Sequence, residues 1–571
     1  MLELVLEQPQ NYINLKLPNT VLTKFNIIDK IKKIIRKELF MEFATKCEQN
    51  LDTIPSLVNR HLASFSSENS EHTDKATEIL KSLRFLLNGH YEKYDFDEGS
   101  ISSLAEKSLS EEDFHKVLYS LNEKQQTQKV KGIFNTPDDT VSFIVSRCAM
   151  LCGENIAYKT MLDPTCGSGE FLLNILKTKL ENSYDSIGVL STIFGNDNDI
   201  LAIEICKVRL FFEMTKWVSV NQYIKVAEIL NRNLTNYDFV NIDTEIFNEK
   251  FDLILGNPPY VEDIKSEIKP KSKFGNIYAN VLQNSIDLLK EDGMIGFIIP
   301  ISYVATARMR KIRKYIEENT NWQYIYNYAD RPSCLFSGVH QKLTILLAQK
   351  GQEQHKIFTS NYQYWYKEER DILFENSTTV ANKYVLENYY PKLGNEIKHK
   401  LFDKIHTNQN DGITSLQKQG NPNVYLNMRA CFWIKAFSFP QLSSEFKEFS
   451  FEESYKWSIL ALLNSSLFWW HWICVSDCWH ITKKELDTIR VPKALTASKE
   501  LVLIAKELEN KLEETKLEIN SKQTAYEYKH KLCKSTIDKI DDYLGEIYGL
   551  TLGETKYIKE FATKYREGLG A

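Results

Sequence analysis

Short apolar runs that alternate with helix-like segments constrain the fold of this chain more than any other feature. Between residues 126 and 350, runs such as 251–255 (FDLIL) and 295–299 (IGFII) are long enough for buried strands. The segments between such runs have helical periodicity, and this alternation is typical of βαβ units. We therefore expect an α/β domain with a mainly parallel sheet over residues 126–350.

The regions on either side of this domain have different predicted secondary structure. The first region is helical and carries no chemical motif; Ala76, Ile79, Leu80, Leu83 and Leu87 form an apolar stripe in it. A tryptophan-rich, irregular region of mixed α and β structure follows the α/β domain, and the chain then returns to helix. The predicted boundaries are 1–125, 126–350, 351–495 and 496–571.

Composition limits the function classes. The net charge of −5, from 71 basic and 76 acidic side chains, excludes a globally basic nucleic-acid binder, so any DNA surface must be local. Ten cysteines without regular spacing are typical of reduced thiols in a cytosolic protein. The uncharged run 458–475 is interrupted by polar residues, so we expect a buried helix–loop–strand and no membrane span.

The first motif with chemical content is 161–172 (MLDPTCGSGEFL). Gly167 and Gly169 let the backbone approach a ligand, and the N-terminus of the helix that follows favours a carboxylate. The carboxylate of Asp163 can accept hydrogen bonds from a ligand ammonium. A structural strand–helix turn explains the same pattern, so the motif alone leaves both interpretations open.

A second acidic site lies in 193–199 (IFGNDND). An acid at the end of the second strand is where a nucleotide ribose is held through its two hydroxyls, which makes Asp197 a candidate. The alternative is an ordinary helix N-cap by Asp197 or Asp199.

The most specific motif is Asn257-Pro258-Pro259-Tyr260, which follows the apolar run 251–255. The two prolines fix the backbone and remove two N–H donors, which leaves carbonyl groups and the Asn257 amide as hydrogen-bonding groups. Such a group can accept both hydrogens of an exocyclic amine, and Tyr260 offers a face on which a planar base can stack. Its place after the two preceding motifs favours a catalytic segment over a simple turn.

Together, 163–169 (DPTCGSG) and 257–260 (NPPY) resemble the gamma-class adenine-N6 DNA methyltransferases with a TaqI-like C-terminal specificity domain. Three further parts of the chain resemble that family. They are 132–137 (GIFNTP) before the cofactor loop, 334–342 (CLFSGVHQK) around its second stacking aromatic, and 463–467 (LNSSL), with Thr482 and 489–492 (IRVP), at the end of its specificity domain. The resemblance implies a Rossmann-like S-adenosylmethionine-dependent methyltransferase domain, followed by a target-recognition domain.

The resemblance also implies roles for individual residues. Asp163 would hold the methionine ammonium of S-adenosylmethionine and Thr136 its carboxylate, while Asp197 would hold the ribose. The remaining cofactor-binding candidates are Thr165, Gly167, Gly169, Asn198 beside the cofactor adenine, and Asn233. Asn233 stands in for an acid that the family usually has near the end of the third strand.

The same resemblance assigns the catalytic residues. Asn257 and Pro258, with Pro259, would receive the target amine, and Tyr260 and Phe336 would enclose the flipped base. The implied reaction moves a methyl group to N6 of adenine in duplex DNA and requires no metal and no dedicated histidine. The implied setting is a restriction-modification system or an orphan methylase, in the cytoplasm of a prokaryotic cell. A cognate restriction endonuclease or a specificity subunit would be the partner, and monomer and dimer stay undecided.

Three other functions stay open. The acceptor could be a protein glutamine or RNA, although such enzymes are usually shorter and lack a C-terminal recognition region. A bifunctional restriction enzyme would also cut DNA, but residues 1–130 lack the Asp and Glu-x-Lys or Asp-x-Lys triplet of a common metal-dependent nuclease, so we expect no cleavage. A non-enzymatic subunit could keep the fold.

Two weaker features have two interpretations each. Lys265, Lys269, Lys271 and Lys273 either contact phosphate or form a solvated loop. His471, Cys474, Cys478 and His480 have spacing unlike a usual zinc site, and we expect them in a buried core.

Overall fold

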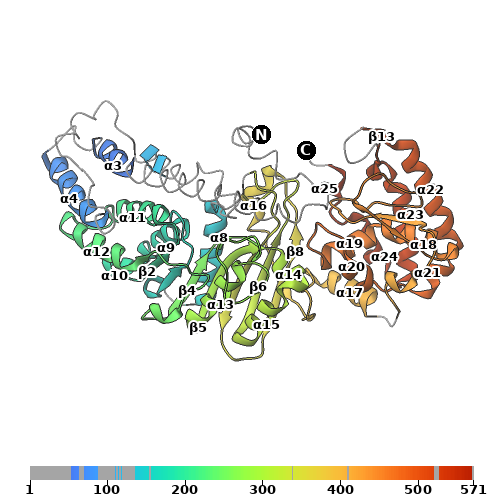
Figure 1. Cartoon of the computed structure of the whole chain (residues 1–571), viewed down its shortest axis with the longest axis horizontal. Coiled ribbons are helices and arrows are strands. Elements are labelled where there is room, and N and C mark those ends of the chain that lie inside the picture. The colour runs from blue at the N-terminus through green and yellow to red at the C-terminus, as the bar shows by residue number, and fades with distance from the viewer. Residues whose placement is uncertain are drawn as a thin grey trace, which may run out of the picture. The chain divides into compact units, whose positions relative to one another are not determined.

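The computed structural model describes residues 53–63, 70–87, 110, 113, 114, 117, 118, 136–153, 156–336, 338–407, 410–519 and 526–568 (Figure 1). The chain divides into two compact units. The first consists of Met1–Leu80 and Leu87–Leu121, and the second of Lys81–Leu86 and Asn122–Ala571.

Two helices are described in the first part of the chain, α3 (Thr53–Ala63) and α4 (Ser70–Leu87). Ala76, Ile79, Leu80, Leu83 and Leu87 are buried, which confirms the apolar stripe expected for this helix. Most of the other residues in the expected helical domain 1–125 lie outside the described part of the chain.

The described residues of the second unit contain a nine-stranded sheet in the order β3-β2-β1-β4-β5-β7-β6-β8-β9. Its strands are β1 (Met161–Asp163), β2 (Ile193–Asn196), β3 (Leu234–Thr235), β4 (Phe251–Gly256), β5 (Leu289–Pro300), β6 (Thr320–Tyr328), β7 (Leu343–Lys350), β8 (Lys356–Gln363) and β9 (Val380–Ala381). Strands β1 to β5 pair in parallel, and β7 is antiparallel to both β5 and β6. The predicted α/β class and the strands predicted at 251–255 and 295–299 are confirmed.

The strand order reverses direction at β1. From β1 the chain adds β2 and β3 on one side, and β4 and β5 follow on the other side. In open α/β sheets a ligand crevice forms at such a point, outside the carboxyl ends of the strands. The sheet therefore places the segments after β1, β2 and β4 at one edge.

Helices cover the sheet, whose central strands β4, β5 and β7 are buried along most of their length (Figure 1). Burial of both strand faces explains why these strands read as continuous apolar runs. The helices are α8 (Asp138–Cys152), α9 (Glu170–Leu180), α10 (Ser186–Ser191), α11 (Ile200–Met214), α12 (Tyr223–Asn233), α13 (Tyr278–Leu288), α14 (Ser302–Ala305), α15 (Arg310–Asn319) and α16 (Arg370–Leu373).

The sheet does not stop at residue 350, where we expected the catalytic domain to end. Strand β8 pairs in parallel with β6, and β9 pairs with β8. The expected boundary falls between β7 and β8 and cuts through the sheet. The partner strand β6 lies far back in the sequence, so the local pattern around residue 350 does not show this pairing.

The tryptophan-rich region is mixed α and β. A three-stranded antiparallel sheet has the order β11-β10-β12. Its elements are α17 (Glu396–His406), β10 (Val424–Asn427), β11 (Ala436–Phe437), β12 (Phe446–Phe449), α18 (Glu453–Asn464), α19 (Ser466–Val475), α20 (Lys483–Thr488) and α21 (Lys493–Ala497).

The helix–loop–strand expected at 458–475 is wrong in its second half. The segment after Ser465 is the helix α19, and the Ser465 hydroxyl caps it by accepting a hydrogen bond from the Phe468 amide at 2.9 Å. Both α18 and α19 are largely buried. Among the described residues no single helix is long and apolar enough to cross a membrane; the bent pair α18–α19 passes that test only by length and composition.

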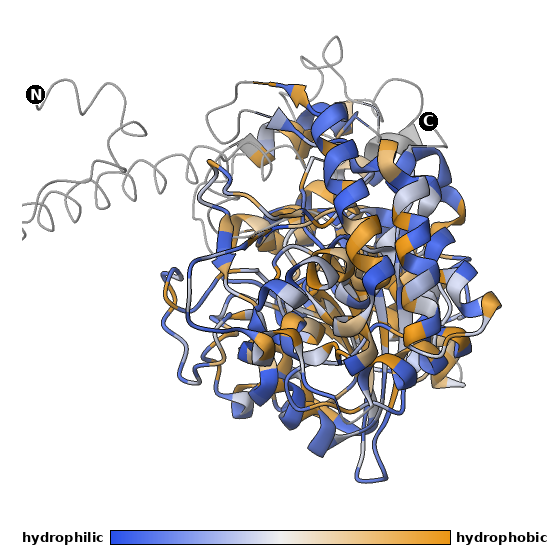
Figure 2. Ribbon diagram, turned by 90° about the vertical axis from the view of Figure 1, so that its right-hand side faces the viewer, coloured by the Kyte–Doolittle hydropathy of each residue, from blue (hydrophilic) through white to orange (hydrophobic). Residues whose placement is uncertain are grey.

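The C-terminal segment is helical, as predicted, with one short hairpin. Its elements are α22 (Lys499–Thr515), β13 (Leu517–Glu518), β14 (Tyr526–Glu527), α23 (Lys534–Ile547), α24 (Leu552–Glu560) and α25 (Thr563–Glu567). Leu501, Leu508, Ile537 and Leu544 are buried where α22 and α23 pack together. Figure 2 shows hydrophobic residues gathered inside and hydrophilic residues on the outer faces of these helices.

Candidate active site at the carboxyl edge of the sheet

Asp163 ends β1 in a buried position. Asp163 is only 1% exposed, and its carboxylate accepts a hydrogen bond from the Thr165 amide at 3.1 Å. Burial raises the pKa of Asp163 well above its ordinary value, the hydrogen bond from Thr165 opposes this shift, and the nearby Asp197 carboxylate adds to it. A cationic ligand group would favour the ionised form of this buried acid.

The glycines shape the turn between β1 and α9. Gly167 has a φ of 51° and Gly169 a φ of 89°, both in the region that favours glycine. A Cβ at Gly169 would lie 2.6 Å from the Cys206 sulfur on α11, whereas a Cβ at Gly167 would meet nothing within 4 Å. Glycine is therefore needed at 169 because a side chain would collide with α11. At 167 glycine is favoured by its positive φ, and the space beside its backbone is open.

Asp197 follows β2 and is tied to the same turn. Its carboxylate accepts hydrogen bonds from the Gly167 amide at 2.8 Å and from the Asp199 amide at 2.9 Å. Burial, and next the charge of Asp199, raise the pKa of Asp197 to about 6. Asp199 is the residue that caps α11, through the Leu201 amide at 3.0 Å, and Asn198 is exposed beside Asp197.

The Asn-Pro-Pro-Tyr segment leaves β4 next to this turn. The Asn257 side-chain amide donates to the Thr136 hydroxyl at 3.0 Å, and the Thr165 hydroxyl donates to the Asn257 backbone carbonyl at 3.4 Å. A Cβ at Gly256 would lie 2.7 Å from the Asp163 carboxylate. The structure therefore brings Thr136, Asp163, Thr165 and Asn257 together.

Tyr260 folds back onto Asn257. Its hydroxyl lies within hydrogen-bonding distance of the Asn257 side-chain oxygen and of the Ile298 carbonyl at 2.8 Å, so it donates to one of them at a time. Burial raises the pKa of the Tyr260 hydroxyl well above its ordinary value. Pro258 is buried and Pro259 is half-buried, and together they hold the segment in a rigid backbone.

Phe336 lies in the loop 329–342 between β6 and β7. Because β6 runs parallel to β5, and Pro300, Tyr328 and Leu343 occupy paired positions at one end of the sheet, this loop emerges at the carboxyl edge of β5 and β6. Phe336 thus shares the edge with Tyr260 and is only 2% exposed. Residues 132–135 and Ser337, which belong to the quoted motifs, lie outside the described residues.

Asn233 does not join the site, so that candidate was wrong. It ends α12, and its amide donates to the backbone carbonyls of Ser191 at 3.2 Å and Ile193 at 2.9 Å. The Ser191 carbonyl ends α10 and the Ile193 carbonyl begins β2, at the opposite end of that strand from Asp197. The side chain therefore holds α12 to the sheet.

The residues at the carboxyl end of β3 are Asn236, Tyr237 and Asp238, which the sequence reasoning missed. Asn236 donates to the Asp197 carbonyl at 2.7 Å, and Asp238 is an exposed acid two residues farther along the chain. The sequence pattern that could have indicated Asp238 is an acid followed by the apolar pair Phe239-Val240. It comes three residues after the two-residue strand β3.

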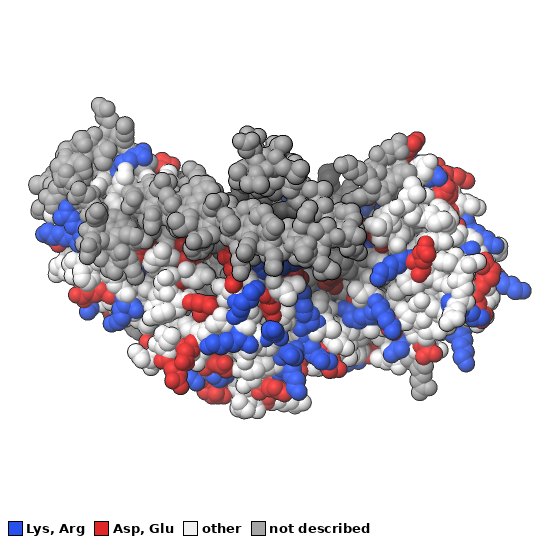
Figure 3. All heavy atoms as spheres, viewed as in Figure 1, with Lys and Arg blue, Asp and Glu red and all other residues white. Residues whose placement is uncertain are grey.

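Basic side chains lie on the surface near this edge. Lys265, Lys269, Lys271 and Lys273 are exposed in the loop that follows Tyr260, although Lys265 forms an ion pair with Glu262 at 2.5 Å. Figure 3 shows lysine and arginine side chains gathered around α15, where Arg310, Lys311 and Lys314 are exposed.

Of the four residues expected in a buried core, His471, Cys474 and Cys478 are buried, whereas His480 is exposed. His471 is hydrogen-bonded to the Glu485 carbonyl at 2.8 Å and to His406 at 2.7 Å, and burial lowers its pKa to about 4. Within the described residues no three His, Cys, Asp or Glu side chains are grouped to hold a metal ion.

Comparison with known proteins gives a family match over part of the chain. Residues 191–334 match the family described as Eco57I restriction-modification methylase. The type II restriction enzyme and methyltransferase RM.Eco57I of Escherichia coli is 22% identical over 46% of this chain and 32% of its own length. The type II methyltransferase M.BanIII of Aneurinibacillus aneurinilyticus is 29% identical, over 37% of this chain and 37% of its own.

Among solved structures, the type IIG restriction endonuclease BpuSI aligns with 91% of this chain and 77% of its own, at 13% identity and a TM-score of 0.43. The chain spans less than half the length of the two curated relatives above. Residues 191–334 therefore resemble a methylase domain of the Eco57I restriction-modification type, and they lie within an α/β Rossmann-like fold.

Proposed function

We propose that this chain is a site-specific DNA methyltransferase that moves a methyl group from S-adenosylmethionine to the N6 amine of an adenine flipped out of duplex DNA. The observation that carries the proposal is the direct contact between the cofactor turn and the Asn-Pro-Pro-Tyr segment, from the Thr165 hydroxyl to the Asn257 carbonyl at 3.4 Å. A donor bound by the turn and an amine bound by Asn257 would meet in one place, as methyl transfer requires.

The residues of the turn fit the proposed cofactor. Asp163 is a buried carboxylate whose pKa is raised, which suits it to an ammonium, and Gly167 leaves open space above the backbone. Asp197 offers a carboxylate for two ribose hydroxyls, and Asp238 lies at the end of the neighbouring strand, where we place recognition of the cofactor's adenine amine. When bound, S-adenosylmethionine supplies an electrophilic methyl group on sulfur.

Asn257 would orient the amine. Its side-chain oxygen lies within hydrogen-bonding distance of the Tyr260 hydroxyl and has a second lone pair, and the two prolines hold the backbone of the segment rigid. The amide is held by Thr136, so its oxygen faces away from that residue. These contacts fix the direction from which the nitrogen approaches the methyl group, and Tyr260 and Phe336 would stack on the flipped base.

Duplex DNA would lie over the exposed lysines at 269, 271 and 273, and the tryptophan-rich region would read the sequence. We place the enzyme with DNA in the cytoplasm of a prokaryotic cell, as part of a restriction-modification system with a possible endonuclease or specificity subunit. An orphan methylase would have the same site. We also propose that this chain has no nuclease activity.

A test with separate acceptors distinguishes the candidate reactions. Purified protein is incubated with S-adenosylmethionine labelled on its methyl group, together with duplex DNA, RNA or protein, with and without magnesium. Label in DNA, at N6 of adenine, supports the proposal. Label only in RNA or in protein glutamine would overturn the substrate, and magnesium-dependent cuts in the DNA would overturn the absence of nuclease activity.

A further inference from the structure

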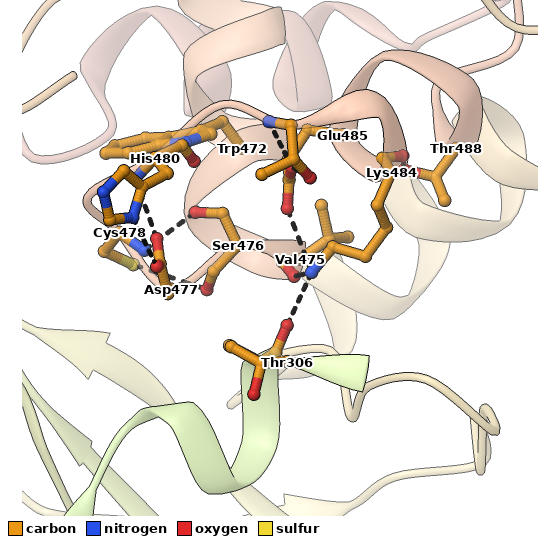
Figure 4. Close-up of polar contacts among 12 residues, drawn as sticks. Thr306, Trp472, Val475, Ser476, Asp477, Cys478, His480, Lys484, Glu485 and Thr488 are labelled. Carbon is orange, nitrogen blue, oxygen red and sulfur yellow. Dashed lines mark hydrogen bonds and ion pairs between the residues drawn. The ribbon is translucent and has the colours of Figure 1, made fainter. Parts of the chain in front are cut away.

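The turn 476–480, which follows α19, is held in one conformation by its own side chains (Figure 4). The Asp477 carboxylate accepts hydrogen bonds from the backbone amides of Trp479 at 2.9 Å and His480 at 2.8 Å. The Ser476 hydroxyl accepts one from the Cys478 amide at 2.9 Å. These contacts hold Cys478 at a φ of 56°, which is costly for a residue other than glycine.

Lys484 ties this turn to the catalytic sheet. Its ammonium donates to the Val475 carbonyl at 2.7 Å and to the Ala305 carbonyl, which ends α14, at 2.6 Å. Both carbonyls lie at helix C-termini, where a cation is favoured. Figure 4 shows Lys484 reaching from its own helix toward Thr306 on the catalytic side, so the turn has a fixed place at the sheet edge.

Trp479 extends from the turn to the loop 329–342, which carries Phe336. The Lys342 ammonium lies 4.3 Å from the centroid of the Trp479 ring, and the Arg331 guanidinium lies 5.9 Å from it. Lys342 also forms an ion pair with Asp330 at 3.0 Å, and both residues are almost fully buried. Asp330 and Lys342 stand at the two ends of the loop, so their ion pair closes its base.

We propose that Trp479 is a positioning residue that couples the recognition region to the base pocket. The Trp479 ring covers Lys342 and holds it on Asp330, and the closed base of the loop fixes the backbone around Phe336. A recognition region seated on its DNA sequence thereby sets the position of the aromatic side chain that encloses the target base. The inference deepens the proposed function and rests on it for the role of Phe336.

Hydrogen exchange tests the coupling without any assay of methylation. Inside the loop the Val339 amide donates to the Phe336 carbonyl at 3.1 Å, and the Gln341 amide donates to the Val339 carbonyl at 2.9 Å. Loss of a partly buried cation–π contact should raise the exchange rates of these amides about tenfold in Trp479→Ala. Trp479→Phe keeps a ring over Lys342 and should restore most of the protection.

Trp457 provides a matched control. It lies on α18 with the Lys456 and Lys506 ammonium groups 5.1 Å and 5.4 Å from its ring centroid, so Trp457→Ala removes the same kind of contact away from the loop. Equal exchange in Trp479→Ala and Trp457→Ala would overturn the inference. If Trp479→Ala does not fold, Lys342→Met removes the cation from the other side and should raise exchange at the same amides; unchanged exchange would again overturn it.

The kinetic counterpart separates this inference from the proposed function. Trp479→Ala should lower kcat for DNA methylation about tenfold while the Kd for S-adenosylmethionine stays unchanged. A wild-type protein that methylates no DNA would refute the proposed function, and the exchange result would still decide the coupling. An active wild type with an equally active Trp479→Ala variant would refute the coupling alone.

Discussion

Protonation of Asp197 should set the pH at which the protein loses affinity for S-adenosylmethionine. Its pKa is raised from an ordinary 3.8 to about 6, first by burial and next by the charge of Asp199. Only the ionised carboxylate can accept hydrogen bonds from both ribose hydroxyls. If binding requires that form, the apparent Kd is multiplied by roughly 11 at pH 5 and by about 1 at pH 7.5.

Asp197→Asn removes this titration and keeps the size of the side chain. Calorimetric titration with S-adenosylmethionine at pH 5 and pH 7.5 gives the ratio of the variant Kd to the wild-type Kd. Titration of the cofactor amine is shared by both proteins and cancels in this ratio, whereas loss of the Asp197 charge also lowers the pKa of Asp163 in the variant. We expect the variant to bind more weakly at pH 7.5, and the ratio to fall about tenfold by pH 5.

The neighbouring acid offers a control. Asp199→Asn keeps the cap of α11, because Asn caps a helix about as well as Asp, and removes the charge that raises the pKa of Asp197. Its affinity should match the wild type at pH 7.5 and persist to lower pH. A Kd ratio for Asp197→Asn that stays constant between pH 5 and pH 7.5 would refute the assigned role of Asp197.

The same shift has a consequence for the free protein. The folded state holds the Asp197 proton more tightly than the unfolded state, so this group's contribution to stability is greatest at low pH. The contribution is lost as pH rises from 3.8 through about 6. Chemical denaturation across this window should show a smaller decline in Asp197→Asn than in the wild type, because Asp163, whose pKa is also raised by burial, remains in both proteins.

Three further predictions address the neighbouring groups. Gly256→Ala places a Cβ 2.7 Å from the Asp163 carboxylate, so the Kd for S-adenosylmethionine should rise by roughly tenfold or more in the same titration. An unchanged Kd would contradict the role of Asp163 in binding the cofactor. Tyr260→Ala should lower kcat/KM by roughly 10–100-fold through lost stacking, whereas Tyr260→Phe, which keeps the ring, should lose far less; equal losses would argue against stacking. Lys271→Ala should weaken binding to all duplexes and reduce the salt slope of affinity by about one, and an unchanged slope would remove Lys271 from the DNA surface.

The sheet core and the helical faces could be predicted because they depend on local patterns. Strands β4 and β5 are continuous apolar runs because both faces are buried, and the stripe in α4 repeats every three or four residues. The contact between the cofactor turn and Asn257 followed from strand order, since the carboxyl ends of β1 and β4 adjoin. The sequence analysis predicted this meeting from the resemblance of the motifs to a known family, and the strand order explains it.

The errors came from short or non-local features. Strand β3 has two residues, too few for a periodic signal, so its end was placed at Asn233 and the residues from Asn236 to Asp238 were missed. An aromatic-rich apolar run fits a strand and a buried helix equally well, and only the cap at Ser465 distinguishes α19. Trp479 contacts Lys342 across a long stretch of sequence, and no local pattern predicts that contact.

The central claim is that Asn257 presents an adenine amine of DNA to a methyl donor held by the turn after β1. Modification-sensitive sequencing of plasmid DNA from cells that express the wild type or Asn257→Ala tests it most directly. We predict one sequence motif methylated at adenine N6 in the wild type and unmodified in the variant, with both proteins binding S-adenosylmethionine. Methylation that persists in Asn257→Ala, or DNA left unmodified by a wild type that binds the cofactor, would contradict the account.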